Sequence, residues 1–303
     1  MRASLAAVAA LLSLAACGGS PGACGSSVTS GDLYLTRYAG TPNLQKVHFD
    51  YTNGKFTLAK PTAVATLNGV DGVVFAPDGD LLVGGQGDVV HKVHIASGKS
   101  IDVRANASAY HVSLDPGGKK LWATGIPGPL AEIPLNPFGK GVAHQLTGDD
   151  ANITSIAFDG SGRSYYTSSG AAGGGSVGRI DLKKFTTKRM ISNLPAAHGM
   201  VFDRFTGNLL LFGSTHITQI DPGTMKVVSD LGITAGVVLD QGTVDGHGYV
   251  FVASNNGQIV FVDYTGSKKV GAKGNKVVVL FVETNLDDVA PLSGVGAASC
   301  TAA

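Results

Sequence analysis

The sequence predicts an all-β protein, a six-bladed β-propeller whose first blade is shared between the two ends of the chain. Three observations lead to this fold class. Short apolar runs alternate with turns rich in Gly and Asp. No long stretch has the 3.6-residue apolar period of an amphipathic helix. A unit of four such runs recurs at intervals of 39, 44, 44 and 42 residues, counted from positions 71, 110, 154, 198 and 240, which is the spacing of propeller blades.

The first half of each unit predicts a tight β-hairpin. An apolar run leads into a turn that contains Asp or Gly, and a second apolar run follows. Glycine tolerates a positive φ and aspartate can accept hydrogen bonds from its own backbone, so both residues favour such turns. The five pairs of runs are 72–79 with 81–83, 112–118 with 121–123, 156–162 with 165–166, 199–207 with 209–211, and 242–248 with 250–252.

The second half of each unit supplies two more strands, so each unit has the four strands of a propeller blade. A solenoid is the competing repeat fold, but its periods are usually shorter. The third strands are expected at 89–95, 130–135, 176–182, 217–220 and 258–262. More polar fourth strands follow, for example at 100–104, 186–190 and 226–229.

Five complete units do not close a ring, and the two ends of the chain supply the missing blade. The N-terminal part offers three strands, 33–38, 45–49 and 55–58, but no first strand. The segment 288–292 resembles a lone first strand, and 276–282 fits the outer strand of the blade before it. Sharing one blade gives six blades and removes free sheet edges. Seven blades is the alternative count, and the propeller domain is expected over residues 31–300.

The first 16 residues predict a signal peptide. Arg2 precedes an apolar run at 3–14 that is too short to span a bilayer. The segment 14–17, Leu-Ala-Ala-Cys, resembles the lipobox of bacterial lipoproteins. That resemblance implies diacylglycerol on Cys17, an anchor and tether at 17–30, and attachment to the cell envelope, at the outer membrane or periplasmic face in a Gram-negative host. An ordinary secretory leader with a chance cysteine is the alternative.

Charge and cysteine content limit the expected partners. Without residues 1–16, which include Arg2, the chain has 22 basic and 22 acidic residues. This balance gives no electrostatic case for nucleic acid or for an anionic surface, and we expect a monomer. The remaining cysteines, Cys24 and Cys300, lie near opposite ends, and a disulfide between them would tie the termini of an exported chain together. Two free thiols are the alternative.

The repeated pattern apolar-apolar-Phe-x-x-x-Gly-x-apolar resembles the NHL, gluconolactonase-like and streptogramin-lyase-like six-bladed propellers, over most of residues 31–296. Two segments resemble the gluconolactonase family in particular. The segment 70–75 resembles its metal-binding Asp-Gly motif, and 197–202 resembles its Asn-Gly motif with His198 in place of Asn. The family's metal-binding Glu near the N-terminus has no counterpart here, and neither does the Glu and His pair of the lyases.

In a propeller, the residue that starts each innermost strand faces the central channel. The residues directly after three of these starting positions, His111, Ser155 and Gln241, are also candidates to face the channel, because the sequence leaves the strand register open by one residue. Carboxylates and imidazoles around one axis suit a divalent cation such as Ca²⁺, Mg²⁺ or Zn²⁺, or general acid–base chemistry. A solvated channel whose polar groups satisfy backbone amides is the alternative. The six starting positions are Asp71, Tyr110, Thr154, His198, Asp240 and Asp288.

Two functions remain open from the sequence. The favoured one is a lipid-anchored envelope protein that binds a protein partner or a small molecule, with Asp71, His111, His198, Asp240 and Asp288 as candidate ligand or metal residues. The alternative is a divalent-metal-dependent lactonase, hydrolase or lyase that acts on a small cyclic substrate. The sequence assigns no catalytic residue for either function.

Overall fold

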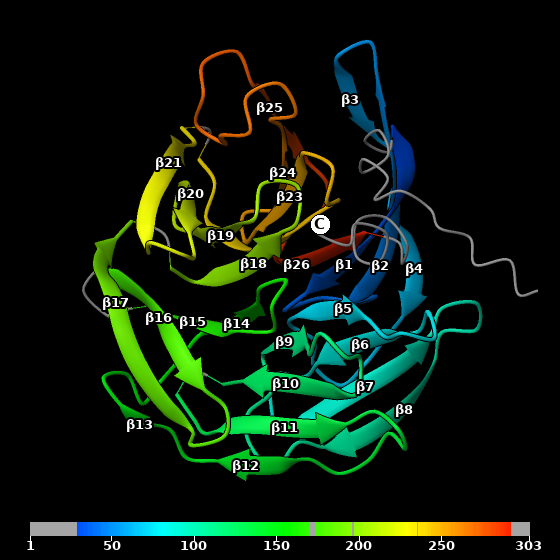
Figure 1. The fold of residues 1–303 in the computed structure, drawn as a ribbon. Coiled ribbons are helices and arrows are strands. Elements are labelled where there is room, and N and C mark those ends of the chain that lie inside the picture. Colours follow the sequence, from blue (N-terminus) through cyan, green and yellow to red (C-terminus); the bar gives the residue numbers. More distant parts are fainter. Residues whose placement is uncertain (1–28, 126, 170–173, 196, 235, 292–303) are drawn as a thin grey trace, which may run out of the picture.

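Six antiparallel sheets are arranged around a central axis as the blades of a propeller (Figure 1). The computed structural model describes residues 29–125, 127–169, 174–195, 197–234 and 236–291. Within them, 26 strands and no helix are found, so the all-β, six-bladed fold is confirmed. No described segment forms a helix long and apolar enough to cross a bilayer. The signal peptide predicted at 1–16, the lipidation predicted at Cys17 and the disulfide predicted between Cys24 and Cys300 fall outside the described residues.

Blades 2 to 4 each place the first strand of the repeat unit innermost and the fourth at the outside, where in blade 4 the extra strand β13 covers it. Blade 2 contains β5 (Val73–Phe75), β6 (Leu81–Gly84), β7 (Val89–His94) and β8 (Lys99–Arg104). Blade 3 contains β9 (His111–Leu114), β10 (Lys120–Thr124), β11 (Leu130–Pro134) and β12 (Val142–His144). Blade 4 contains β13 (Thr147–Gly148), β14 (Ser155–Phe158), β15 (Ser164–Ser168), β16 (Gly175–Asp181) and β17 (Thr186–Leu194).

Blades 5 and 6 repeat this order, and the outer strand expected at 276–282 is present as β25. Blade 5 contains β18 (Gly199–Asp203), β19 (Asn208–Gly213), β20 (His216–Asp221) and β21 (Lys226–Gly232). Blade 6 contains β22 (Leu239–Val244), β23 (Tyr249–Ser254), β24 (Gln258–Asp263) and β25 (Lys276–Phe281).

Blade 1 is shared between the two ends of the chain, as the sequence predicts. Its innermost strand is β26 (Leu286–Pro291), which starts two residues earlier than expected and pairs with β1 (Ser30–Arg37). Leu33 faces Pro291 and Leu35 faces Val289 in this antiparallel pair. The blade continues with β2 (Leu44–Thr52), β3 (Lys55–Leu58) and β4 (Thr62–Ala65).

The short strands β4 and β13 were not predicted. Strand β2 has nine residues, and β3 pairs only with its last four, from Phe49 to Thr52. Strand β4 pairs with the first part of β2, so two short strands together cover one long edge. Strand β13 pairs in parallel with β17 and forms the outer edge of blade 4. Both strands cover sheet edges that would otherwise present unpaired backbone groups.

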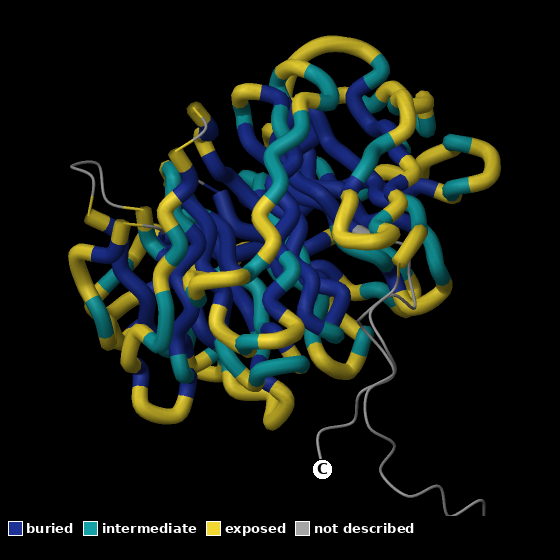
Figure 2. Tube along the Cα trace, turned by 90° about the horizontal axis from the view of Figure 1, so that it is seen from above, coloured by how far each residue is buried: buried dark blue, intermediate teal, exposed yellow. Residues whose placement is uncertain are grey.

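Buried side chains between neighbouring blades form the core, and exposed residues lie mainly at the turns (Figure 2). Aromatic residues fill the junction between blade 6 and the shared blade. The rings of Phe56 and Phe261 stack with centroids 4.2 Å apart, and Phe49 packs against Phe251 at 5.1 Å. Burying one such side chain stabilises the fold by about 1.5–3 kcal/mol. This junction therefore holds the closing blade to its neighbour through packing as well as through strand pairing.

All six innermost strands run in the same direction along the channel, which gives the propeller two different ends. We call the end where these strands start the site end, and the end where they finish the tether end. Because β1 is antiparallel to β26, Ser30 and Pro291 both lie at the tether end. The described chain therefore begins and finishes on the same side of the molecule.

Candidate functional site

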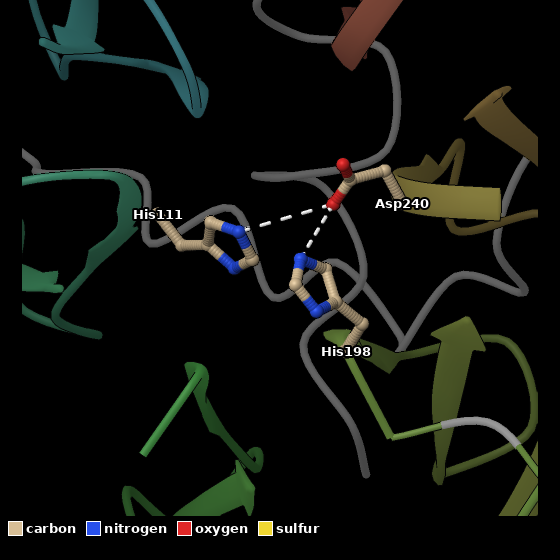
Figure 3. A group of neighbouring side chains, drawn as sticks. All are labelled: His111, His198 and Asp240. Carbon is tan, nitrogen blue, oxygen red and sulfur yellow. Dashed lines mark ion pairs between the residues drawn. The ribbon is translucent and has the colours of Figure 1, made fainter. Parts of the chain in front are cut away.

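Three polar side chains from three blades converge at the site end of the channel (Figure 3). His111 starts β9, His198 directly precedes β18, and Asp240 is the second residue of β22. Close contact between blades 5 and 6 depends on Gly199. A Cβ atom at Gly199 would lie 2.7 Å from the carbonyl oxygen of Asp240, so only glycine permits this approach.

Asp240 is the centre of the cluster. Its Oδ1 lies 2.8 Å from Nε2 of His198 and 3.9 Å from Nε2 of His111. The two imidazole rings meet edge to face, with centroids 4.7 Å apart. One ligand atom from each of the three residues lies within 4.8 Å of the others. The cluster is therefore compact enough for all three side chains to contact one bound atom.

The charges of these groups follow from burial and from their pairing. Burial alone would raise the pKa of Asp240, but its contact with His198 lowers it to about 2. Burial alone would lower the pKa of His198, but pairing with Asp240 raises it above its usual value. Burial and the neighbouring His198 lower the pKa of His111 to about 3. At neutral pH, His111 is therefore an uncharged imidazole, which is the form that binds metals.

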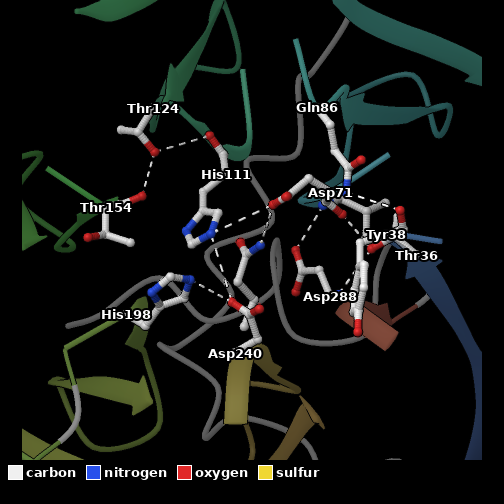
Figure 4. A network of polar contacts seen from close by, with 12 residues as sticks. Thr36, Tyr38, Asp71, Gln86, His111, Thr124, Thr154, His198, Asp240 and Asp288 are labelled. Carbon is white, nitrogen blue, oxygen red and sulfur yellow. Dashed lines mark hydrogen bonds and ion pairs between the residues drawn. The ribbon is translucent and has the colours of Figure 1, made fainter. Parts of the chain in front are cut away.

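Asp71 lies beside the cluster as a second buried carboxyl group (Figure 4). Its Oδ1 lies 3.7 Å from Nε2 of His111 and accepts a hydrogen bond from Nε2 of Gln241 at 3.2 Å. Burial, together with the negative charge of Asp240, raises the pKa of Asp71 to about 7. Burial and the carboxylates of Asp71 and Asp240 raise the pKa of Asp287 well above its usual value. The site thus holds more carboxyl groups than can be ionised together.

Asp288 has a different role from the cluster residues. Its Oδ2 accepts a hydrogen bond from the backbone N–H of Val73 at 2.8 Å, and its Oδ1 accepts one from Val289 at 2.7 Å. The bond from Val73 joins β26 to the start of β5, and both bonds direct the carboxyl group to the backbone (Figure 4). Asp288 therefore satisfies backbone amides, which is the alternative considered for all the channel residues.

The other predicted channel positions also lie away from the cluster. Tyr110 contributes its backbone carbonyl, which accepts a hydrogen bond from Gly72 N–H at 3.0 Å. The hydroxyl group of Thr154 contacts that of Ser169 at 3.0 Å. The structure thus resolves the one-residue ambiguity in blade 3, where His111 rather than Tyr110 supplies the cluster side chain.

Two contributing residues were missed in the sequence. Nδ2 of Asn255 donates to Oδ2 of Asp240 at 2.8 Å and to the backbone carbonyl of Leu286 at 2.9 Å, so it holds the carboxylate against the closing strand. Asp287 is visible in the sequence as the first residue of the pair Asp287–Asp288, and the alternation of β-strand faces was the signal that could have selected it. Asn255 gave no signal, because its partner lies 15 residues away.

A pocket of about 340 Å³ opens beside His198 and Asp240, between blades 4, 5 and 6. Its wall is mostly small or apolar, which suits a small organic ligand held by few polar groups. The lining residues other than His198 and Asp240 are Ser169, Gly175, Pro195, Ala197, Gly213, Ser214, Val238, Leu239 and Asn255. The cluster therefore has an adjoining space for a reacting group.

The donor set fits a divalent cation. Oδ1 of Asp240 is buried and receives no hydrogen bond from any described residue. Such a buried polar atom is costly unless a ligand or water satisfies it. Two imidazoles and one carboxylate are typical ligands of Zn²⁺ and similar ions, which place their donors about 3.3 Å apart in tetrahedral sites. The separations of 2.8 and 3.9 Å to Asp240 bracket that value.

No family model matches the chain, and no curated protein sequence is significantly similar to it. Solved structures resemble its fold. The periplasmic gluconolactonase of Pseudomonas aeruginosa aligns with a TM-score of 0.59 at 14% identity, over 87% of this chain and 99% of that chain. A Bacteroides fragilis protein provisionally assigned as a 6-phosphogluconolactonase aligns with a TM-score of 0.57 at 8% identity, over 88% of this chain and 98% of that chain.

A third similar structure is a Bacteroides thetaiotaomicron protein of unknown function. It aligns with a TM-score of 0.55 at 11% identity, over 85% of this chain and 80% of that chain. At these identities the comparisons establish the propeller fold alone. They do not assign an activity, because one fold can host unrelated activities.

Proposed function

We propose that the protein is a divalent-metal-dependent lactonase that opens a small cyclic ester. The observation that carries the proposal is the convergence of His111, His198 and Asp240 beside a pocket of about 340 Å³. The names of two similar structures, a gluconolactonase and a provisional 6-phosphogluconolactonase, support the same reaction class. This was the alternative function in the sequence analysis, and the site geometry now favours it over a pure binding protein.

Each residue of the site has a role in the proposed reaction. His111, His198 and Asp240 would hold the cation, which when bound supplies Lewis-acid polarisation of the ester carbonyl. Asn255 orients the carboxylate of Asp240 through its hydrogen bond of 2.8 Å. Asp71 is the candidate general base, because a carboxyl group with a pKa of about 7 can accept a proton from water and return it at neutral pH.

Metal titration and a substrate panel test the proposal together. Metal-stripped protein is titrated by calorimetry with Zn²⁺, Mn²⁺, Ca²⁺ and Mg²⁺, and lactones of five- and six-membered rings are then assayed with each ion. We expect one strong site for a transition metal, with ring opening that depends on that ion. Metal binding without turnover across the panel would favour the binding-protein function, and absence of both would exclude the lactonase.

We also propose that the protein is exported and held to the cell envelope by lipid on Cys17, after removal of residues 1–16. The lipobox-like segment 14–17 supports the anchor, and the periplasmic location in the name of one similar structure supports the compartment. Labelling with a clickable fatty acid should mark the wild type, while Cys17→Ser should be unlabelled and released from membranes. A labelled Cys17→Ser protein would contradict the anchor.

A further inference from the structure

The tether end carries a basic loop that projects from blade 6. The loop spans residues 264–275 and connects β24 to β25, and Figure 1 shows it at the outer edge beside β21. Its first residues contact the inner hairpin turns at the tether end. The backbone N–H of Tyr264 donates to the carbonyl of Gly248 at 3.0 Å, and Nζ of Lys268 lies 5.5 Å from the ring centroid of Phe205.

The loop is held in a defined shape by blade 5. Gln219 is fully buried and donates to the carbonyl of Lys268 at 3.1 Å, while its Oε1 accepts from the N–H of Val270 at 3.2 Å. The side chain of Val270 is itself fully buried. Gly271 N–H donates to Oγ of Ser229 at 2.9 Å. These contacts present the loop lysines from a fixed position on the edge between blades 5 and 6.

The lysines of this region have no acidic partners. The loop and the starts of β21 and β25 carry five exposed lysines, which are Lys226, Lys268, Lys269, Lys273 and Lys276. None of them forms an ion pair with a described carboxylate. Asp221 and Asp263 lie opposite Lys226 and Lys276 in the strand register, whereas the 264–275 loop itself contains no acidic residue beside Lys268, Lys269 and Lys273. Five lysines against these two aspartates leave the region with an excess of positive charge.

Exposed apolar side chains lie next to two of these lysines. Val227 follows Lys226 on β21 and is 47% exposed, and Val277 follows Lys276 on β25 and is 37% exposed. Lysines interspersed with exposed aliphatic groups are typical of surfaces that lie on lipid headgroups. There the methylene groups of the lysine side chains also make apolar contacts with the lipid.

The first described residues lie close to this basic region. The N–H of Tyr51 donates to the carbonyl of Thr29 at 2.6 Å, and the hydroxyl of Tyr51 donates to Oδ2 of Asp263 at 2.9 Å. Asp263 is the last residue of β24, directly before the loop. Thr29, the first described residue, therefore lies on the same side of the propeller as the start of the loop.

We infer that this face, formed by Lys226, Val227 and the 264–275 loop with Lys276 and Val277, docks on an anionic lipid surface. The overall charge balance of the sequence does not exclude a local excess of lysines on one face. At the site end, the exposed Arg104 pairs with Asp88 at 2.5 Å, and the buried Arg37 pairs with Glu283 at 3.5 Å. Docking through the tether end would orient the His111–His198–Asp240 cluster away from the membrane.

Vesicle binding by the chain that begins at Gly18 tests the inference without a contribution from lipid on Cys17. That chain keeps every described residue. Partitioning is measured by co-sedimentation with vesicles of phosphatidylcholine alone and with 30% phosphatidylglycerol, at low salt and at 0.5 M NaCl. We expect binding only to the anionic vesicles, and we expect it to fall strongly at high salt because the attraction is screened.

The variant Lys269→Glu/Lys273→Glu isolates the loop, and Lys140→Glu/Lys188→Glu is its matched control. The control pair is also exposed and lies on blades 3 and 4, away from the loop. A lysine near an anionic surface contributes about a fivefold gain in partitioning, so the loop variant should bind roughly 30-fold or more weakly. The control should bind within about threefold of the parent chain.

Three results would overturn the inference. The first is equal binding to neutral and anionic vesicles. The second is a control variant that loses as much affinity as the loop variant. The third is salt-sensitive retention on heparin, lost in the loop variant, with no binding to anionic vesicles, which would assign the lysines to a soluble polyanion instead. Circular dichroism of each variant confirms that the propeller is intact.

Discussion

Nε2 of His198 lies 2.8 Å from Oδ1 of Asp240, across the junction between blades 5 and 6. The short contact explains the mutual pKa shifts of the two groups, but its angles do not meet hydrogen-bond geometry, since Oδ1 of Asp240 receives no hydrogen bond from a described residue. The imidazole and the carboxylate are thus close together without satisfying each other's donor and acceptor directions. A cation between them and His111 would satisfy these atoms, and this is the basis of the first prediction.

Asp240→Asn should abolish tight metal binding. The substitution keeps the size of the side chain but removes the only anionic donor of the three-residue cluster, so we expect the affinity for the preferred ion to fall about 100-fold or more. Calorimetric titration of metal-stripped protein measures the loss. Asp230→Asn is the control, because Asp230 also lies beside a histidine of blade 5, with Oδ2 3.7 Å from Nε2 of His216. Equal losses in both variants would contradict the site.

Asn255→Ala should weaken metal binding about 10- to 100-fold while leaving the fold intact. Asn255 is not one of the three proposed ligands, but it donates a hydrogen bond to Oδ2 of Asp240. Partners of this kind orient the metal ligands. Asn256→Ala is the matched control, since Asn256 donates in a similar way to the carbonyl of Gly236 at 2.8 Å. Affinity and lactone turnover are measured for both. Unchanged affinity in Asn255→Ala would remove Asn255 from the site.

Thr36→Val should destabilise the shared blade. The hydroxyl of Thr36 is fully buried, donates to the carbonyl of Asp71 and accepts from the N–H of Asp288 at 3.0 Å. Valine leaves both backbone groups unpaired, which costs about 2–4 kcal/mol of unfolding free energy. Urea denaturation measures the change. Thr62→Val removes an exposed hydroxyl with one long bond of 3.3 Å, and it should change the stability by less than about 0.5 kcal/mol.

Asp159 should make the stability depend on pH in the acid range. Burial alone would raise its pKa, but hydrogen bonds from Ser161 and Arg163 lower it to about 2. A depressed folded-state pKa stabilises the protein above the unfolded value of about 3.9, and that stabilisation is lost as the pH falls toward 2.

The substitution Asp159→Asn isolates this contribution. It should cost about 1–2 kcal/mol at pH 7, and the difference from wild type should shrink between pH 4 and pH 2. Urea denaturation at pH 7, 4 and 2.5 measures it, with the exposed Asp50→Asn as the control. A difference that stays constant over this range would show that Asp159 acts only through packing.

The expected disulfide between Cys24 and Cys300 stays a prediction, because both cysteines lie outside the described residues. Leu33 faces Pro291 where β1 pairs with β26. In the sequence, Cys24 stands nine residues before Leu33, and Cys300 stands nine residues after Pro291. We expect intact exported protein to lose about two mass units relative to the reduced form, and this difference should be absent in Cys24→Ser. Labelling of both thiols in native protein would refute the bond.

The sequence predicts the blades well because their determinants are local. Alternating apolar residues and Gly or Asp turns define each hairpin, and Asp159 with Gly162 shows why, since the carboxylate accepts from Ser161 N–H while Gly162 adopts a φ of +81°. The closing strand was predictable because one blade lacked its first strand. The strand β4 was not, because its pairing depends on the length of β2.

The site is less predictable because it depends on distances between blades. Asp71, His198 and Asp240 could be placed at the channel from their positions in the repeat. The choice between Tyr110 and His111 could not be made, because a shift of one residue reverses which side chain faces the axis. The backbone role of Asp288 was also hidden, since the N–H of Val73 that it satisfies lies 215 residues away in the chain.

The innermost strand of blade 1 is the last part of the propeller to be synthesised. Until β26 is available, β1 has an open edge, and the buried side chains of Leu33 and Leu35 lack the strand that covers them. Asp287, Asp288 and the carbonyl that holds Asn255 arrive with the same strand. A chain that stops before β26 therefore lacks both ring closure and a complete polar site, so the proposed activity would be confined to molecules whose synthesis has been completed.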